Sequence, residues 1–253
     1  MSPSDYRATF AERGGAYDDA MGSEPQARDE EFAFVLGLAD PSPPCRLLDA
    51  PAGGGYLAEH LPTGVEYVAL ESASSFAARC RDRGLTVIED DISAPSVAGA
   101  TFDAVVSVAG VHHESDLSAV LAAWRRLLRP GGRVVVADVA QGSDVATFLD
   151  GFVGVFNTSG HAGHYLGADL ATLAEQAGFD APRVVDGAYH WWFADEHALG
   201  RYCRRLFGLD GVTDEEIVEA ARHRLGIDVA PDGRVGLRWG LRAVVAAAPE
   251  ATD

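Results

Sequence analysis

Two adjacent histidines, His112 and His113, stand in the segment GVHHESD, directly after the apolar run DAVVSV. An imidazole titrates near neutral pH and can take a proton from a hydroxyl or a carbon acid. If the run is a strand of a parallel sheet, the pair lies at the edge where such sheets bind ligands. Because adjacent side chains alternate in direction, we predict that His113 faces the pocket as general base, with His112 the second candidate. The alternative is a pair that only caps the helix beginning near Ser115.

A glycine-rich turn lies earlier in the chain. The segment LLDAPAGGGYLAEHL, residues 47–61, begins like a buried strand, breaks at Pro51 and three glycines, and resumes as an amphipathic helix. Glycines let the backbone approach a ligand, and the first turn of a helix offers unpaired N–H groups. The dinucleotide fingerprint G-x-G-x-x-G does not match, because Pro51 takes the place of its first glycine. We therefore expect a small polar ligand at this turn.

Acidic residues end the next two apolar runs. Glu71 follows EYVAL, and the segment EDDI spans residues 89–92. A carboxylate at the end of a strand can accept two hydrogen bonds from a ribose diol. These acidic ends disfavour a phosphate group and favour a nucleoside.

The chemistry-bearing segments fall on an alternation of strands and helices, which predicts an α/β fold with a mostly parallel sheet. The clearest helix has apolar residues at helical spacing between Leu117 and Leu128. Seven strands are expected, at 46–50, 66–70, 86–89, 103–108, 133–139, 183–193 and 238–247.

Five segments in order resemble motifs of the class I S-adenosylmethionine-dependent methyltransferases: LLDAPAGGGYL, VALESA, EDDI, FDAVVSVAGVHHESD and LLRPGGRVVVADV. The resemblance covers about residues 45–190. It implies a Rossmann-like sheet of seven mostly parallel strands, with helices on both faces and the last strand antiparallel. It also implies S-adenosyl-L-methionine as cofactor and S-adenosyl-L-homocysteine as product. Pro51 departs from the pattern, since proline lacks the N–H of the usual glycine.

The resemblance assigns the cofactor to one set of residues along the carboxyl ends of the first strands. Of these, Asp49, Gly53 and Gly55 would lie near the methionine part, Glu71 at the ribose, and Asp91 at the adenine. The full set is Asp49, Ala50, Gly53, Gly55, Glu71, Ser72, Asp91, Ile92 and Val108.

Beyond the core, the chain carries more than such a fold requires. We divide it into an N-terminal helical arm at 1–44, a core at 45–193 and 236–248, and cap insertions at 143–166 and 194–235. The first insertion is rich in Phe, Gly and His, and the second contains two helices, one opened by the capping box TDEE. We expect the insertions to form a lid over the substrate, with a dimer interface as the competing interpretation.

The residues expected to contact substrate are mostly aromatic or histidine: Tyr17, His161, His164, Tyr165, Tyr189 and Trp191. His161 and His164 could ligate a metal together with Asp138 or Glu114. Magnesium prefers oxygen ligands, however, and the sequence has no compact carboxylate cluster there. We therefore predict no metal ion.

Composition restricts the partners. The formal net charge of −18 opposes binding to nucleic acid or to an anionic membrane, and no run of about 18 apolar residues occurs. Three cysteines without paired spacing indicate a reducing compartment, and we expect a cytoplasmic monomer or homodimer. All 20 basic residues are arginine, a bias typical of GC-rich bacterial coding.

The sequence thus predicts methyl transfer from S-adenosylmethionine to a small, partly apolar metabolite, in bacterial specialised metabolism. One alternative is an isomerase or cyclase that binds the same cofactor without consuming it. Another, an NAD-dependent oxidoreductase, conflicts with the missing glycine fingerprint.

Overall fold

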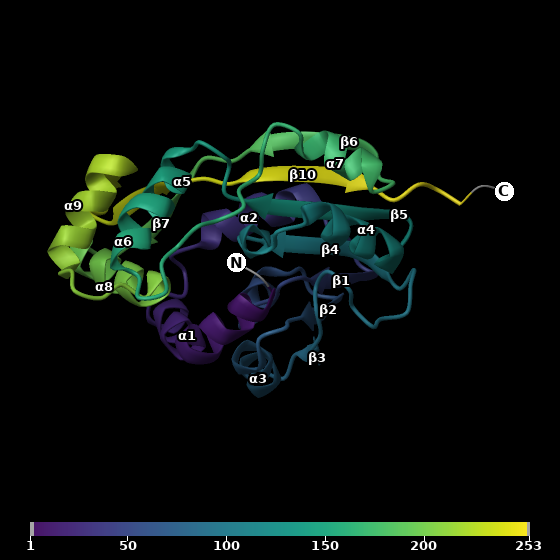
Figure 1. Cartoon of the computed structure of the whole chain (residues 1–253), viewed down its shortest axis with the longest axis horizontal. Coiled ribbons are helices and arrows are strands. Elements are labelled where there is room, and N and C mark those ends of the chain that lie inside the picture. The colour runs from purple at the N-terminus through teal and green to yellow at the C-terminus, as the bar shows by residue number, and fades with distance from the viewer. Residues whose placement is uncertain (1–2, 252–253) are drawn as a thin grey trace.

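A seven-stranded sheet, in the order β3-β2-β1-β4-β5-β10-β6, is the centre of the protein (Figure 1). The computed structural model describes residues 3–251. The strands are β1 (Cys45–Asp49), β2 (Val65–Leu70), β3 (Thr86–Ile88), β4 (Phe102–Val108), β5 (Leu128–Asp138), β6 (Asp180–Asp186), β7 (Tyr189–Phe193), β8 (Ile227–Val229), β9 (Val235–Trp239) and β10 (Arg242–Ala247). The first five pair in parallel, whereas β10 is antiparallel to both β5 and β6. The predicted fold class is confirmed.

Helices cover both faces of this sheet and its carboxyl edge. They are α1 (Pro3–Ser23), α2 (Asp29–Ala39), η1 (Tyr56–His60), α3 (Ser74–Asp82), η2 (Val111–His113), α4 (Leu117–Leu127), α5 (Asp144–Phe148), η3 (Leu149–Val153), α6 (Gly154–Phe156), α7 (Leu170–Gln176), α8 (Glu196–Phe207) and α9 (Asp214–Arg224). Within residues 3–251, none of these helices has the length and apolarity that a bilayer crossing requires.

The central strands β1, β4, β5 and β10 send alternate side chains into two separate cores, as the two-residue period of a strand requires. Leu47 packs with α2 and the cap on one face, whereas Leu48 packs with α4 and α7 on the other. Both leucines are fully buried. Burial on both faces explains why these central strands are largely apolar.

Two expected strands are each divided in two, and here the sequence prediction was wrong. The expected strand 183–193 is β6 followed by β7, and 238–247 is β9 followed by β10. β7 and β9 leave the main sheet and form a second sheet with β8, in the order β7-β9-β8. The β6–β7 and β9–β10 segments both bend where Gly187 and Gly240 meet. A Cβ on Gly240 would lie 2.4 Å from the Gly187 carbonyl oxygen. Only a residue without a side chain permits this crossing.

The prediction of an amphipathic helix after the glycine turn was also wrong. The structure has η1 instead, a 3₁₀ helix of five residues that ends at His60, shortly before Pro62. The turn itself is tightly packed, because a Cβ on Gly55 would lie 2.4 Å from a Leu85 methyl carbon. Gly55 also has a φ of 79°, which glycine adopts at least cost.

The cap stands at the carboxyl edge of the sheet. In Figure 1, β10 points to the right, so the parallel strands end at the left, where α1, α6, α8 and α9 gather. α1 packs against both α8 and α3, and α8 packs against α9. The N-terminal helix therefore bridges the cap and the first half of the sheet.

Candidate active site

A cavity lies between the carboxyl edge of the sheet and the cap. Its space, including the open mouth, is about 1070 Å³. The predicted site residues that line it are Tyr17, Asp49, Gly53, Val108, His112, His113, His161 and Trp191. The remaining predicted residues lie behind this lining and are described below.

His112 is held by a buried carboxylate. Its Nδ1 lies 2.8 Å from Asp138 Oδ1, and its backbone N–H donates to Asp138 Oδ2 at 3.0 Å. Asp138 ends β5 and is fully buried. A carboxylate at Nδ1 fixes the tautomer in which Nδ1 carries the proton and Nε2 is the free acceptor. His112 is therefore oriented as a base at the cavity wall.

His113 has different surroundings. Its ring packs against Tyr6 and Phe10 of α1, with ring centroids 5.3 Å and 5.7 Å away. Burial holds the pKa of His113 well below its ordinary value, and the neighbouring His112 ring lowers it further. Both histidines line the cavity, whereas the sequence predicted that only one would. The reason is that η2 is a 3₁₀ turn, in which adjacent side chains do not alternate as in a strand.

A second histidine–aspartate pair lies in the first cap insertion. His161 Nδ1 is 3.3 Å from Asp150 Oδ1, and Tyr165 donates its hydroxyl to the same oxygen. Burial lowers the pKa of His161 to about 4, with the nearby His112 as the next cause. Its ring centroid is 5.6 Å from that of His112. His164 contributes only its backbone N–H, which donates to the His112 carbonyl at 2.8 Å.

Two buried carboxyl groups stand at the glycine turn. Asp49 accepts a hydrogen bond from the Tyr67 hydroxyl at 2.7 Å. Glu71 accepts from the Gly53 N–H at 2.8 Å and from the Ala73 N–H at 2.7 Å. Burial raises the pKa of each group to about 7, although these hydrogen bonds act in the opposite direction. Of the two, only Asp49 reaches the cavity surface.

These raised pKa values predict a specific dependence of stability on pH. Between the unfolded values near 4 and the folded values near 7, the folded protein binds more protons, so the free energy of unfolding falls as pH rises. Glu71→Gln, which cannot titrate, should remove about 1–3 kcal/mol of that fall. Urea unfolding between about pH 5 and 8 measures it. The exposed Glu66 supplies the control, Glu66→Gln, and an unchanged pH slope in Glu71→Gln would contradict the prediction.

The N-terminal helix covers the acidic strand ends. Tyr6 donates its hydroxyl to Glu71 at 3.2 Å, and Arg7 lies 3.6 Å from the Asp91 carboxylate. Asp91 also accepts from the Ser93 hydroxyl at 2.7 Å. The predicted ribose and adenine positions are therefore covered by α1 in this structure.

Three further predicted cofactor residues have structural contacts. Ala50 is buried and donates its N–H to the Val106 carbonyl at 2.9 Å. Ile92 is buried, and its carbonyl accepts from the Trp124 indole at 2.9 Å. Ser72 follows Glu71 and is partly buried. All three residues follow the carboxyl ends of strands, where the sequence predicted them. None of them lines the cavity.

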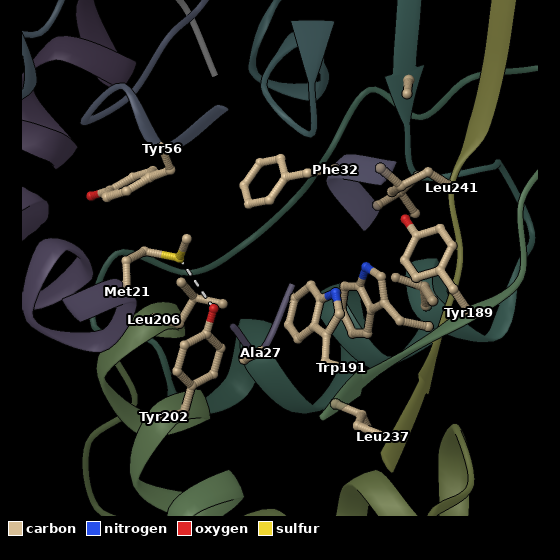
Figure 2. Packing of buried hydrophobic residues seen from close by; sticks show 14 of the residues in the cluster. Met21, Ala27, Phe32, Tyr56, Tyr189, Trp191, Tyr202, Leu206, Leu237 and Leu241 are labelled. Carbon is tan, nitrogen blue, oxygen red and sulfur yellow. Dashed lines mark hydrogen bonds between the residues drawn. The ribbon is translucent and has the colours of Figure 1, made fainter. Parts of the chain in front are cut away.

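Phe32, Trp191 and Trp239 form one wall of the cavity, which we call the aromatic wall. Figure 2 shows Phe32 of α2, Trp191 of β7 and Tyr202 of α8 in one cluster, with the Tyr202 hydroxyl directed at the Met21 sulfur. Trp191 stacks on Trp239 at a centroid distance of 4.1 Å. Tyr189 lies behind this wall, where its hydroxyl donates to the buried Glu31 at 3.2 Å.

A buried ion pair supports the aromatic wall, and the sequence interpretation missed it. The Arg28 Nε donates to Glu31 Oε1 at 2.8 Å, and its Nη1 donates to the Tyr17 hydroxyl at 2.8 Å. Trp191 donates its indole N–H to Glu31 Oε2 at 3.1 Å. The two charges neutralise each other, so this network positions the wall without adding net charge. The spacing of three residues between Arg28 and Glu31 in a helical segment was the available signal.

Comparisons with known proteins agree with this architecture. The methyltransferase domain family matches residues 48–136, which hold the glycine turn, Glu71 and both histidines. Residues 48–136 are therefore a methyltransferase domain. The recognition made from the five motifs is thereby confirmed.

Two curated relatives of this chain are O-methyltransferases by name. The ubiquinone biosynthesis O-methyltransferase of Cereibacter sphaeroides is 33% identical over 112 residues, covering 42% of this chain and 45% of that protein. The nocamycin O-methyltransferase of Saccharothrix syringae is 34% identical over 139 residues, covering 49% and 48%. The chain thus spans about half the length of the curated relatives it matches.

A solved structure shares the fold over nearly the whole chain. It is the phosphoethanolamine N-methyltransferase 2 of Haemonchus contortus in complex with S-adenosyl-L-methionine, with 14% identity and a TM-score of 0.65. The match covers 97% of this chain and 60% of that one.

The residues at the glycine turn fit S-adenosylmethionine, the cofactor that the methyltransferase domain implies. S-adenosylmethionine carries an ammonium group, a carboxylate, a sulfonium group and a ribose diol. The glycine turn presents two buried carboxyl groups, Asp49 and Glu71, whose ionised forms are disfavoured while no cation is near. A cationic ligand rich in hydroxyl groups would favour the ionised form of both. Among residues 3–251, no group of three or more potential metal ligands comes together.

Proposed function

We propose that this protein transfers the methyl group of S-adenosylmethionine to an oxygen of a small, mostly apolar acceptor. The observation that carries the proposal is the Asp138–His112 pair, which presents a free imidazole Nε2 at the wall of a cavity next to the glycine turn. Both curated relatives are named O-methyltransferases, which favours oxygen as the acceptor atom.

In this proposal His112 acts as the general base. Asp138 holds the proton on Nδ1, and Nε2 takes the proton of the acceptor hydroxyl as its oxygen attacks the methyl carbon. The proton then resides on Nε2, and the Asp138 carboxylate stabilises the resulting imidazolium. His113 has no carboxylate partner among the described residues and a strongly lowered pKa, so we assign it to packing against the acceptor. This exchanges the roles that the sequence suggested for the two histidines.

S-adenosylmethionine supplies an already activated methyl group. The protein must therefore align the acceptor and exclude water, and alignment alone accounts for roughly 7–11 kcal/mol of a barrier. Tyr6 and Phe10 of α1, together with the cap insertion around His161, close the cavity over the histidines. We propose that α1 and the cap act together as the lid.

The nucleoside would lie along the acidic strand ends, as the family resemblance implies. We propose that Glu71 holds the ribose, that Asp91 and Ile92 contact the adenine, and that Asp49 and Gly53 face the amino acid part. Tyr6 already uses the Glu71 oxygen that a ribose hydroxyl would need. Cofactor binding would then displace the Tyr6 hydroxyl and shift α1.

Tyr6→Phe should consequently strengthen cofactor binding. The substitution removes the hydrogen bond that competes with the ribose, and one such bond is worth about 0.5–1.5 kcal/mol, or about 2- to 10-fold in affinity. Calorimetry with S-adenosylhomocysteine measures the change. Tyr165→Phe is the matched control, because its hydroxyl pairs with Asp150 in the cap. A weaker affinity in Tyr6→Phe would show that this hydroxyl contacts the cofactor instead.

The deciding experiment is detection of S-adenosylhomocysteine by mass spectrometry, with the protein incubated with S-adenosylmethionine and a library of phenols and hydroxy acids. Formation of S-adenosylhomocysteine together with a methylated acceptor supports methyl transfer. An altered acceptor with unconsumed cofactor would instead identify an isomerase or cyclase. Binding of NAD in place of S-adenosylhomocysteine would identify an oxidoreductase.

We place this activity in bacterial specialised metabolism, in the cytoplasm, with a monomer or homodimer acting on a free small molecule. The aromatic wall formed by Phe32, Trp191 and Trp239 supports an apolar acceptor body. The formal charge of −18 supports the expectation that neither nucleic acid nor a membrane surface is a partner.

A further inference from the structure

One cation in the cavity has no anionic partner. Arg13, on α1, lines the cavity and donates from Nη2 to the Leu206 carbonyl at 3.3 Å. Its Nε is buried and has no hydrogen-bond partner among the described residues. Within the same residues, no carboxylate oxygen comes within 4.0 Å of its guanidinium nitrogens, whereas Arg28 in the same lining is paired with Glu31. A buried polar group without a partner is costly, and for a charged group the cost is larger.

The end of α8 packs against the Nε side of the Arg13 guanidinium. Gly208 lies beside the guanidinium, and a Cβ there would stand 2.5 Å from the Arg13 Nε. Phe10 offers its ring at 6.0 Å from the guanidinium carbon. Arg13 lines the same cavity as His113 and His161, and the Phe10 ring also lies 5.7 Å from the His113 ring.

Arg13 belongs to the acceptor side of the cavity. Its contacts in the described chain are to Phe10 on its own helix and to Leu206 and Gly208 at the end of α8. The glycine turn has its own charged groups, the carboxyl groups of Asp49 and Glu71, which suit the cationic part of the cofactor. We therefore assign an anion at Arg13 to the second ligand, and the test below separates this assignment from one to the cofactor's own carboxylate.

We propose that Arg13 binds a carboxylate, or an equivalent oxyanion, of the acceptor, so that the substrate is an apolar hydroxy acid. The anion takes the Nη1–H groups, which have no hydrogen-bond partner among the described residues. The hydroxyl faces His112, and the apolar body lies against the aromatic wall. This assignment rests on the proposed function for the role of the hydroxyl. The recognition of an anion by Arg13 is testable without catalysis.

The test uses hydroxynaphthoate and its uncharged amide as probes, measured by calorimetry with and without saturating S-adenosylhomocysteine. The wild-type protein should bind the acid about 10- to 100-fold more tightly than the amide, since a charge-assisted pair is involved. Arg13→Met should reduce this ratio to about 1. Arg205→Met is the matched control, because Arg205 is an exposed arginine of α8 and should leave the ratio unchanged.

A second variant separates anion binding from a structural tie between α1 and α8. Arg13→Gln keeps a donor for the Leu206 carbonyl but carries no charge, so it should fold and still lose the preference for the acid. Equal binding of acid and amide by the wild type, absence of binding by both, or a preference that survives in Arg13→Gln would overturn the proposal. So would a loss of S-adenosylhomocysteine affinity with the preference intact, which would assign Arg13 to the cofactor's own carboxylate. If the wild type fails to bind S-adenosylhomocysteine, only the proposed function is contradicted.

Discussion

His112→Ala should lower the turnover number for methyl transfer by roughly 10²- to 10⁴-fold, the usual contribution of a positioned general base. The affinity for S-adenosylhomocysteine should stay within about twofold, because the ring faces the acceptor and not the nucleoside. Turnover is measured with an acceptor found in the library, by mass spectrometry of the methylated product. The difference in turnover between the wild type and His112→Ala should become smaller at high pH, where the acceptor hydroxyl ionises without a general base.

Two variants decide whether His112 acts through its pair with Asp138. Asp138→Asn replaces a carboxylate oxygen at 2.8 Å from Nδ1 and should lower turnover by about 10- to 10³-fold, because the tautomer and the imidazolium lose their support. His113→Ala removes a packed ring and should cost less than about tenfold in turnover. The reverse order, with His113→Ala slow and His112→Ala fast, would make His113 the base, as the strand geometry suggested.

For the two histidines, the sequence predicted their position at the edge of the sheet but not the direction or the partners of each ring. Their place at the carboxyl edge followed from the apolar run before them. The direction of each ring depended on η2 being a 3₁₀ turn, and the groups that distinguish them come from distant segments. Asp138 reaches His112 from β5, and Tyr6 reaches His113 from α1. Such pairings depend on tertiary packing, which a local pattern does not encode.

The main sheet of the fold was predictable from local sequence patterns, whereas the second sheet, which depends on a distant contact, was not. Alternation of strands and helices over the core is a local signal, and the resemblance in the five motifs implied seven mostly parallel strands with the last one antiparallel. The second sheet was missed because β6–β7 and β9–β10 each read as one apolar run. Their division is caused by the contact between Gly187 and Gly240, which are 53 residues apart in the chain.

The cavity chemistry was the least predictable part. Tyr17, His161 and Trp191 were expected to contact substrate from their residue types, and all three line the cavity. Arg13 and Arg28 were not expected to do so. Both are single arginines on helical segments, which usually carry solvated charges. Their burial becomes visible only when α1 is packed against α8 and α2 against β7.

Glu71→Ala should weaken binding of S-adenosylhomocysteine by about 10- to 100-fold, the effect of losing a charge-assisted hydrogen bond to the ribose. Glu71 is fully buried at the end of β2, and Tyr6, Gly53 and Ala73 already donate to its two oxygens. A ribose hydroxyl would take the place of Tyr6. Calorimetry measures the loss, and Glu66→Ala at the opposite end of the same strand provides the control, since Glu66 is exposed and pairs with Arg46.

The effect on the loop must be separated from the effect on the ligand, because Glu71 also accepts hydrogen bonds from the Gly53 and Ala73 N–H groups. Methylthioadenosine, which keeps the ribose but lacks the amino acid, resolves the two. Loss of a ribose contact reduces the affinities for both ligands by the same factor. A distorted glycine turn affects mainly the amino acid part, and therefore reduces S-adenosylhomocysteine binding more than methylthioadenosine binding. Equal losses support the ribose assignment, and an unchanged affinity for methylthioadenosine contradicts it.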